Sequence, residues 1–336
     1  MITIKDVAKA AGVTPTTVSN VIHGNEGRVS PQTVAIIRQT IEKLGYIPNL
    51  SARALVNSAS RIIGVINHIV PQESGGFFQD PFSGALLTGI EQTLRQNGYY
   101  LMVRTVKSTD ELLNLLANWN IDGLIFIGVF PMEFYQAIKR TRTAFLLIDS
   151  YIDDPQPMQL RLEDEQGGYL AARYLIEMNH RNILFCSPKA EDEGVIRRRR
   201  AGFLRALEEN GIAHSQNNDY ACEFEIDEAR DLGKRLAKRN DFTAIFATAD
   251  ILAAGIVSGL QSAGRIVPDE ISIVGFDDLA ISRLCTPQLT TIHQDIVARG
   301  ERAAMMLVER LGGQQPENCV FPVRLVERQS VRRLPE

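Results

Sequence analysis

The sequence predicts a small helical head followed by a larger α/β body, and three observations support this division. The chain has 336 residues, more than one ordinary domain holds. Up to about residue 48, apolar residues recur at helical spacing between Gly and Pro breakers. From residue 61 onward, short apolar runs alternate with amphipathic segments. We therefore expect a head at 1–48, a hinge helix or linker at 49–60 and a body at 61–336.

Three helices are expected in the head, each opened by a capping residue, with proline in the first turn of the second and third. The cap signals are Thr3, Thr14-Pro15 and Ser30-Pro31. The expected helices are 4–11, 15–22 and 31–44. Two short helices joined by a tight turn, with a third closing the core, are typical of a helix-turn-helix. An ordinary three-helix bundle shares these signals, so spacing alone leaves both open.

The charge of the chain is unevenly distributed. Residues 1–61 hold seven Lys or Arg and three Asp or Glu, a net charge of +4, whereas the whole chain carries −4. A basic head on an acidic body favours a polyanionic partner for the head, although a chance distribution of this size is the alternative.

The composition excludes several classes of protein. A hydrophobic content of 45% and a charged content of 23% are typical of a soluble globular protein. No apolar run approaches the roughly 18 residues of a membrane span, and the N-terminus lacks the pattern of a signal peptide. The four cysteines form no CxxC pair, which argues against structural zinc. We expect a cytoplasmic protein without membrane partner, metal or cofactor.

Several segments of the head and linker resemble the lac and gal repressor family of bacterial transcription regulators. They are 3–8 (Thr-Ile-Lys-Asp-Val-Ala), 11–14 (Ala-Gly-Val-Thr), 17–19 (Thr-Val-Ser), 44–49 (Leu-Gly-Tyr-Ile-Pro-Asn) and 52–55 (Ala-Arg-Ala-Leu). Many matching positions at matching spacing make this signal specific. The resemblance implies sequence-specific DNA binding by the second helix and a hinge helix at the operator.

The resemblance also implies roles for individual residues. The residues that fall where the family reads bases are Pro15, Thr16 and Asn20. Those that fall where it contacts phosphates are Thr3, Thr14, Thr17, Ser19 and His23. Those of the minor-groove hinge are Ala52, Arg53 and Leu55, with Leu55 as the wedge between base pairs. The family commonly has Arg where this chain has Asn20, which leaves the operator sequence open. Residues 49–58 have a flexible linker as their alternative, because so short a helix is marginal in water.

The body is expected to form two lobes, each built on a parallel sheet with helices on both faces. The predicted strands are 62–66, 100–103, 123–129, 144–148, 183–186, 244–247 and 271–275. The helices that show most clearly are 85–96, 168–178 and 201–209. We expect a first lobe at 61–159 and 293–319 and a second at 160–289 and 320–336. Ligands of such sheets bind beyond the carboxyl ends of the strands, which here means between the lobes.

Parts of the body resemble the family's sensor region, which is similar to periplasmic sugar-binding proteins. The matching segments include 89–91 (Gly-Ile-Glu), 122–123 (Asp-Gly), 180–181 (His-Arg), 274–278 (Val-Gly-Phe-Asp-Asp) and 289–292 (Leu-Thr-Thr-Ile). With the head, the resemblance covers nearly the whole chain. It implies a small-molecule effector, a sugar or sugar derivative, bound in a cleft between the lobes.

Five residues are candidates for binding this effector: Asp277, Arg199, Phe82, Ser83 and Phe276. Asp277 ends a predicted strand, so its carboxylate can accept hydrogen bonds in the cleft. Asp277 or Asp278 could instead cap the following helix. Arg199 can reach the cleft as a five-donor fork, and Phe82 can stack on a ring or belong to the core.

The sequence favours a regulator over an enzyme, because it lacks GxSxG, HExxH, P-loop and GxGxxG motifs. We expect a repressor that acts as a homodimer on a near-palindromic operator and is controlled by a carbohydrate effector. The alternative is control by a docked protein coregulator, with the cleft secondary. Residues 320–336 are expected to form a strand and a charged end, without the leucine heptads of a tetramer-forming coil.

Overall fold

The computed structural model describes residues 2–22, 24–46, 60–67, 80–128, 132–154, 157–188 and 194–335. The chain divides into two compact units, Met1–Arg61 and Ile62–Glu336, which are described separately. Among the described residues, the helices are all too short or too polar to cross a bilayer.

The first unit is a three-helix domain whose helices have the predicted bounds. They are α1 (Ile4–Ala11), α2 (Pro15–Ile22) and α3 (Pro31–Leu44), with a 3-10 turn at Glu26–Arg28. The buried core consists of Val7, Ala8, Val18, Val21, Val34 and Ile37. The hydroxyl of Thr14 accepts a hydrogen bond from the Thr17 backbone N–H at 3.2 Å, and Ser30 does the same for Thr33 at 3.2 Å. Residues 47–59, which include nearly all of the expected hinge helix, lie outside the described residues.

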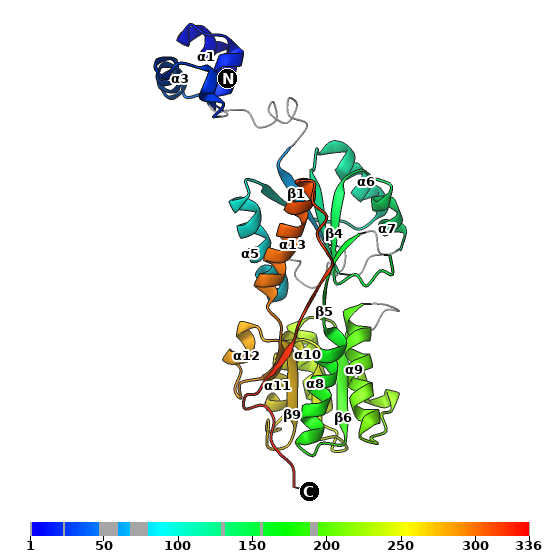
Figure 1. The fold of residues 1–336 in the computed structure, drawn as a ribbon. Coiled ribbons are helices and arrows are strands. Elements are labelled where there is room, and N and C mark those ends of the chain that lie inside the picture. The colour runs from blue at the N-terminus through cyan, green and yellow to red at the C-terminus, as the bar shows by residue number, and fades with distance from the viewer. Residues whose placement is uncertain are drawn as a thin grey trace. The chain divides into compact units, whose positions relative to one another are not determined.

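The first lobe of the body is a six-stranded parallel sheet in the order β11-β5-β4-β3-β1-β2. Its strands are β1 (Ile62–Asn67), β2 (Tyr100–Thr105), β3 (Gly123–Ile127), β4 (Ala144–Ile148), β5 (Met158–Leu162) and β11 (Cys319–Phe321). Two helices, α5 (Pro81–Gln96) and α13 (Ile296–Leu311), pack together over one face. The other face is covered by α6 (Thr109–Asn118) and α7 (Met132–Lys139), as Figure 1 shows.

The second lobe is a six-stranded sheet in the order β12-β10-β9-β8-β6-β7. Its strands are β6 (Ile183–Ser187), β7 (Asp219–Ala221), β8 (Ala244–Ala247), β9 (Ser272–Asp277), β10 (Thr290–His293) and β12 (Arg324–Val326). The helices on one face are α8 (Asp164–Glu177) and α9 (Val195–Glu209), and those on the other are α10 (Ile226–Leu236) and α11 (Asp250–Ser262). A short helix, α12 (Ala280–Leu284), follows β9. Only β12 runs antiparallel to its neighbour, which departs from the purely parallel sheet expected.

The chain passes between the lobes three times, after β5, after β10 and after β11 (Figure 1). These points correct the expected lobe limits by a few residues, because the boundary after residue 159 falls inside β5 and that after 319 falls inside β11. The C-terminal stretch forms two three-residue strands in different sheets rather than one strand. Strands this short at a sheet edge carry no apolar run that the sequence could reveal.

Candidate functional site

The candidate DNA-facing surface of the first unit is the outer side of α2. Val18 and Val21 are buried on the inner side, against α1 and α3. Pro15 and Thr16 are exposed at the start of the helix, and Asn20 is half-buried one turn later. The exposed side therefore presents short side chains, which leave the helix backbone free to approach the floor of a major groove.

The described residues expected at phosphates lie just before α1 (Thr3), just before α2 (Thr14) and within α2 (Thr17 and Ser19). Thr3 and Thr14 are exposed, whereas Thr17 and Ser19 are half-buried. The hydroxyls of Thr14 and Thr17 lie 2.9 Å apart, and the Thr3 hydroxyl donates to the Asp6 carboxylate at 2.7 Å. The remaining DNA candidates, His23, Ala52, Arg53 and Leu55, lie outside the described residues.

The candidate effector site of the body is a cluster of buried polar side chains at the carboxyl ends of both sheets. Its members are Asp149, Asp164, Arg199, Thr248, Asp277, Gln294 and Arg299, and each is less than 10% exposed. We call them the strand-end cluster. The backbone φ angles of Asp149 and Asp277 are 58° and 108°, a region that costs energy for residues other than glycine. Backbone strain of this kind concentrates at functional sites.

Arg199 lies at the centre of the second-lobe part of the cluster. Its Nε donates to Asp164 Oδ1 at 2.8 Å, and its Nη1 donates to the Thr248 carbonyl at 2.6 Å. The guanidinium carbon lies 3.5 Å from the centre of the Phe276 ring, which is wholly buried. Phe276 therefore packs its ring against the Arg199 guanidinium.

Close packing of α8 against α9 brings Arg199 to Asp164. A Cβ atom on Gly168 of α8 would lie 1.9 Å from the Arg199 carbonyl oxygen, and one on Gly202 of α9 would lie 1.8 Å from that of Glu165. Only glycine permits this approach. Asp164 also accepts a hydrogen bond from the Tyr151 hydroxyl. Burial raises the pKa of Asp164, and the charge of Arg199 opposes that shift.

Asp277 ends β9 and is buried within the cluster, as the strand pattern predicted. Its Oδ1 accepts a hydrogen bond from Gln294 Nε2 at 2.6 Å, so its direct partner is a neutral amide. Burial raises the pKa of Asp277 to about 7. The charge of Arg199 and the Gln294 hydrogen bond oppose this shift, whereas Asp80 and Asp164 add to it. Asp277 is thus a strong acceptor that loses its proton near neutral pH.

The alternative role of Asp277 as a helix cap finds no support in its contacts. The cap position of α12 is Leu279, and it makes no side-chain cap bond. The Leu279 N–H donates instead to Asp250 Oδ2 at 2.8 Å. The neighbouring Asp278 does bond to α12, because it accepts from the Ser282 hydroxyl at 3.2 Å.

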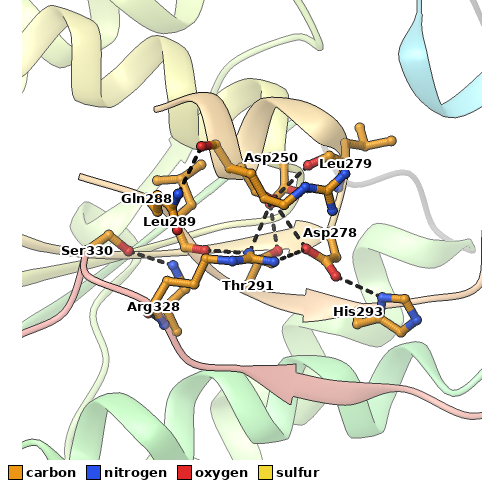
Figure 2. A network of polar contacts seen from close by, with 12 residues as sticks. Asp250, Asp278, Leu279, Gln288, Leu289, Thr291, His293, Arg328 and Ser330 are labelled. Atoms are coloured by element: carbon orange, nitrogen blue, oxygen red, sulfur yellow. Dashed lines mark hydrogen bonds and ion pairs between the residues drawn. The ribbon is translucent and has the colours of Figure 1, made fainter. Parts of the chain in front are cut away.

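A second polar network holds the loop that follows Asp277 (Figure 2). Asp278 accepts from Arg328, and its Oδ2 lies 2.9 Å from His293 Nδ1. Burial alone would raise the pKa of Asp278, but these two hydrogen bonds outweigh it and keep the pKa low. Asp250 Oδ1 accepts from the Thr291 hydroxyl at 2.6 Å. These contacts connect the loop after β9, strand β10 and the C-terminal segment next to Asp277.

The first-lobe candidates lie at the start of α5. Asp80 caps this helix by accepting from the Phe82 and Ser83 backbone N–H groups at 3.1 and 3.0 Å. The Ser83 hydroxyl also donates to Asp80, and Phe82 packs against the first-lobe core. Phe82 thus follows the core alternative. Because Asp80 raises the pKa of Asp277, this helix start faces the same cluster.

Several residues at this edge of the two sheets were not predicted from the sequence. Asp149 follows the apolar strand β4 just as Asp277 ends β9, so the same rule would have found it. Phe224 follows β7 at the same edge of the second sheet and is 43% exposed, which makes it an available aromatic face. Nothing in the sequence singles out Gln294 or Arg299, because their role depends on partners distant in the chain.

Comparisons with known proteins agree with this geometry. The family model described as "Bacterial regulatory proteins, lacI family" matches residues 3–49, and the "Periplasmic binding protein-like domain" matches residues 172–331. The HTH-type transcriptional repressor PurR of Aliivibrio salmonicida (strain LFI1238) is 33% identical over 344 residues, which cover 99% of this chain and 100% of that protein.

Solved structures show the same arrangement. The lac repressor dimer bound to operator and the anti-inducer ONPF has a TM-score of 0.86 and 25% identity, over 98% of this chain and 99% of that one. A complex of the transcriptional regulator CelR with cellobiose has a TM-score of 0.73 and 25% identity, over 98% and 100% of the two chains. The helical head and two-lobed body thus define a DNA-binding transcription regulator with a periplasmic-binding-protein-like sensor. The chain belongs to the lacI family of bacterial regulatory proteins, and it is a transcriptional repressor rather than an enzyme, as the sequence predicted.

Proposed function

We propose that the operator affinity of this repressor is controlled by a sugar or sugar derivative bound at the strand-end cluster. The observation that carries the proposal is Asp277, a buried carboxylate at a strand end whose hydrogen-bond partner is neutral. Sugar hydroxyls can donate to such a carboxylate and accept from a guanidinium such as that of Arg199. The CelR neighbour, a complex with cellobiose, supports a carbohydrate class.

Effector binding requires the lobes to change their arrangement, because the cluster is buried and its groups bond to one another. The three passages between the lobes are the places where such a change is absorbed. The effector then shifts the population between two arrangements of the body by its differential affinity for them. Phe224, exposed beside this edge, offers a face on which a sugar ring can stack.

On the DNA side, α2 enters the major groove with Pro15, Thr16 and Asn20 at base edges. Exposed cations of the head, among them Lys5, Lys9 and Arg28, supply attraction to phosphates. The protein acts in the cytoplasm as a homodimer on a near-palindromic operator, with Leu55 as the minor-groove wedge. The comparisons do not favour the alternative, control by a docked protein coregulator.

A thermal-shift screen of the full-length protein against mono- and disaccharides tests the effector. A compound that raises the melting temperature should lose its effect in Asp277→Ala and keep it in the control Asp153→Ala, an exposed carboxylate of the same body. Losing two hydrogen bonds to a charged acceptor, each contributing roughly 1.5–3 kcal/mol, reduces affinity by about a hundredfold or more. A compound that stabilises both variants equally would contradict the role of Asp277, and silence across the panel would oppose a carbohydrate effector.

A further inference from the structure

Arg299 is an unusual residue for its place in the fold. It lies in the first turn of α13 and is 0% exposed. A buried cation costs several kcal/mol in desolvation, and the start of a helix is the unfavourable end for positive charge. The cost is offset by Asp149, whose Oδ1 accepts from Arg299 Nη2 at 2.5 Å. In a buried ion pair the desolvation cost can cancel the attraction between the charges, so stability alone does not explain Arg299.

Arg299 sets the orientation of the Gln294 amide. A guanidinium has only donors, so the group of Gln294 that faces Arg299 Nη1 is the acceptor, Oε1. The amide nitrogen of Gln294 then necessarily faces the other way, where Nε2 donates to Asp277 Oδ1 at 2.6 Å. The hydrogen bond that Asp277 receives therefore depends on Arg299.

These four residues form a hydrogen-bonded chain from one lobe to the other. Asp277 ends β9 in the second lobe, and Gln294 lies in the passage between β10 and α13. Arg299 belongs to α13, which packs on the first sheet, and Asp149 follows β4 of that sheet. All four side chains are less than 10% exposed, and each contact in the chain is a direct hydrogen bond between side chains. We call it the inter-lobe relay.

We propose that Arg299 is a positioning residue that couples the state of Asp277 to the first lobe through the amide of Gln294. The inference rests on the proposed function, because it assumes that the effector binds at Asp277. An effector that takes the place of Gln294 on Asp277 frees the amide to turn, and the turned amide presents a donor instead of an acceptor to Arg299. Binding of the ligand at Asp277 thereby changes the hydrogen bonds of Arg299 and, through them, acts on Asp149 without contacting it.

The first test uses the proton as the ligand of Asp277 and needs no effector. The charged groups that face Asp277 are Arg199 of α9, Asp80 before α5, Asp164 of α8 and Asp250 of α11. The melting temperature of the wild-type protein and of each variant named below is measured from pH 5 to 9. Each is compared with the same full-length protein that carries Asp277→Asn in addition. The pH dependence of the difference reports the titration of Asp277 together with its coupling to these neighbours, because everything else acts in both members of the pair.

In the otherwise wild-type pair we expect a plateau pH near 7, the pH at which the growing difference in melting temperature levels off, because this is the pKa of Asp277 in the folded protein. Gln294→Leu should move it upward by about one pH unit, since a hydrogen bond to the charged form favours ionisation by roughly that amount. Arg299→Met and Arg299→Lys should produce the same shift. Lysine keeps the charge but lacks the fork that reaches both Asp149 and Gln294, and it serves as the test if the methionine variant does not fold.

The matched control is Ser330→Ala, which removes buried hydrogen bonds to Thr290 and Ile273 in the same sheet. It should lower the melting temperature without moving the plateau pH. A plateau pH that is unchanged in Gln294→Leu would overturn the relay, and one that moves in Gln294→Leu but in neither Arg299 variant would overturn the role of Arg299.

The second test follows the signal into the first lobe. At pH 8, where Asp277 is ionised, hydrogen–deuterium exchange of peptides covering residues 144–154 is compared between wild type and Asp277→Asn. We expect a difference in the wild-type background that disappears in the Arg299→Lys background, with residues 226–236 unchanged throughout. A difference that persists without Arg299, or no difference at all, would refute the coupling. Because neither test uses an effector, both outcomes stand apart from the search for one.

Discussion

Replacing Asp277 by Asn tests the electrostatics of the site, because the amide has the same shape but no charge to lose. Burial raises the pKa of Asp277 from 3.8 to about 7 in the folded protein. The folded state therefore binds this proton more strongly than the unfolded state does. Stability contributed by the protonated form is fully present below about pH 4 and is lost as the pH rises through 7.

The size of the effect follows from the shift of about three pH units, at 1.36 kcal/mol for each unit. Wild-type protein at pH 8 should thus be up to about 4 kcal/mol less stable than Asp277→Asn, relative to their difference at pH 4. For a unit of this size that corresponds to roughly 5–10 °C in melting temperature. Asp164 and Asp250 also have raised pKa values, and the part of their contribution that does not depend on the charge of Asp277 cancels in the comparison.

The assay is calorimetric melting of both full-length proteins at intervals between pH 4 and 9. We expect the stability of Asp277→Asn relative to wild type to increase as the pH rises from about 4 and to level off near pH 7. Parallel curves over the whole range would refute the account, since they would mean that Asp277 is neither desolvated nor titrating near neutral pH. A gain that already levels off near pH 5 would mean that the pKa of Asp277 is only slightly raised.

Four further predictions follow from the contacts and the resemblance. DNA affinity should fall steeply between low and moderate salt in filter binding, because phosphate contacts release counterions; a flat response would argue against them. Asn20→Ala should relax base preference at one pair per half-site by about 1–3 kcal/mol in a selection from random duplexes, whereas a uniform loss would make Asn20 a phosphate contact. Leu55→Ala should reduce operator bending in a gel-phasing assay while the melting curve stays unchanged; equal bending would exclude the wedge. Arg328→Met should lower the free energy of unfolding by about 3 kcal/mol at pH 7 in urea titrations, because it leaves Asp278 buried and without its arginine; a loss below about 1 kcal/mol would mean that His293 and water satisfy this carboxylate.

The sequence predicted the head more closely than the body for a physical reason. The ends of α1, α2 and α3 are set by local signals, namely capping hydroxyls, Pro15 and Pro31 in the first turn, and glycine at the end. The strands at the sheet edges, such as β11 and β12, are three residues long and half-exposed. Their pairing is decided by the tertiary structure, so no local signal marks their boundaries.

The same contrast applies to the site. Asp277 was found because it ends an apolar strand, and that rule needs only the neighbouring residues. Arg299 was not predicted as a site residue, because its partner Asp149 lies 150 positions away in the chain. A single Arg in an amphipathic helix is ordinarily expected at the surface. For a related reason the sequence does not reveal that the Arg199 guanidinium covers the ring of Phe276, because these two residues are far apart in the chain.

The measurement that tests the central claim most directly is operator affinity of the full-length protein with and without the stabilising compound from the sugar screen. A duplex selected from a random pool serves as the operator. The account predicts a near-palindromic sequence whose dissociation constant changes with the compound, and a compound affinity that changes by the same factor when that duplex is present. A compound that binds the body with no change in DNA affinity, or a pool that yields no enriched sequence, would contradict an effector-controlled repressor.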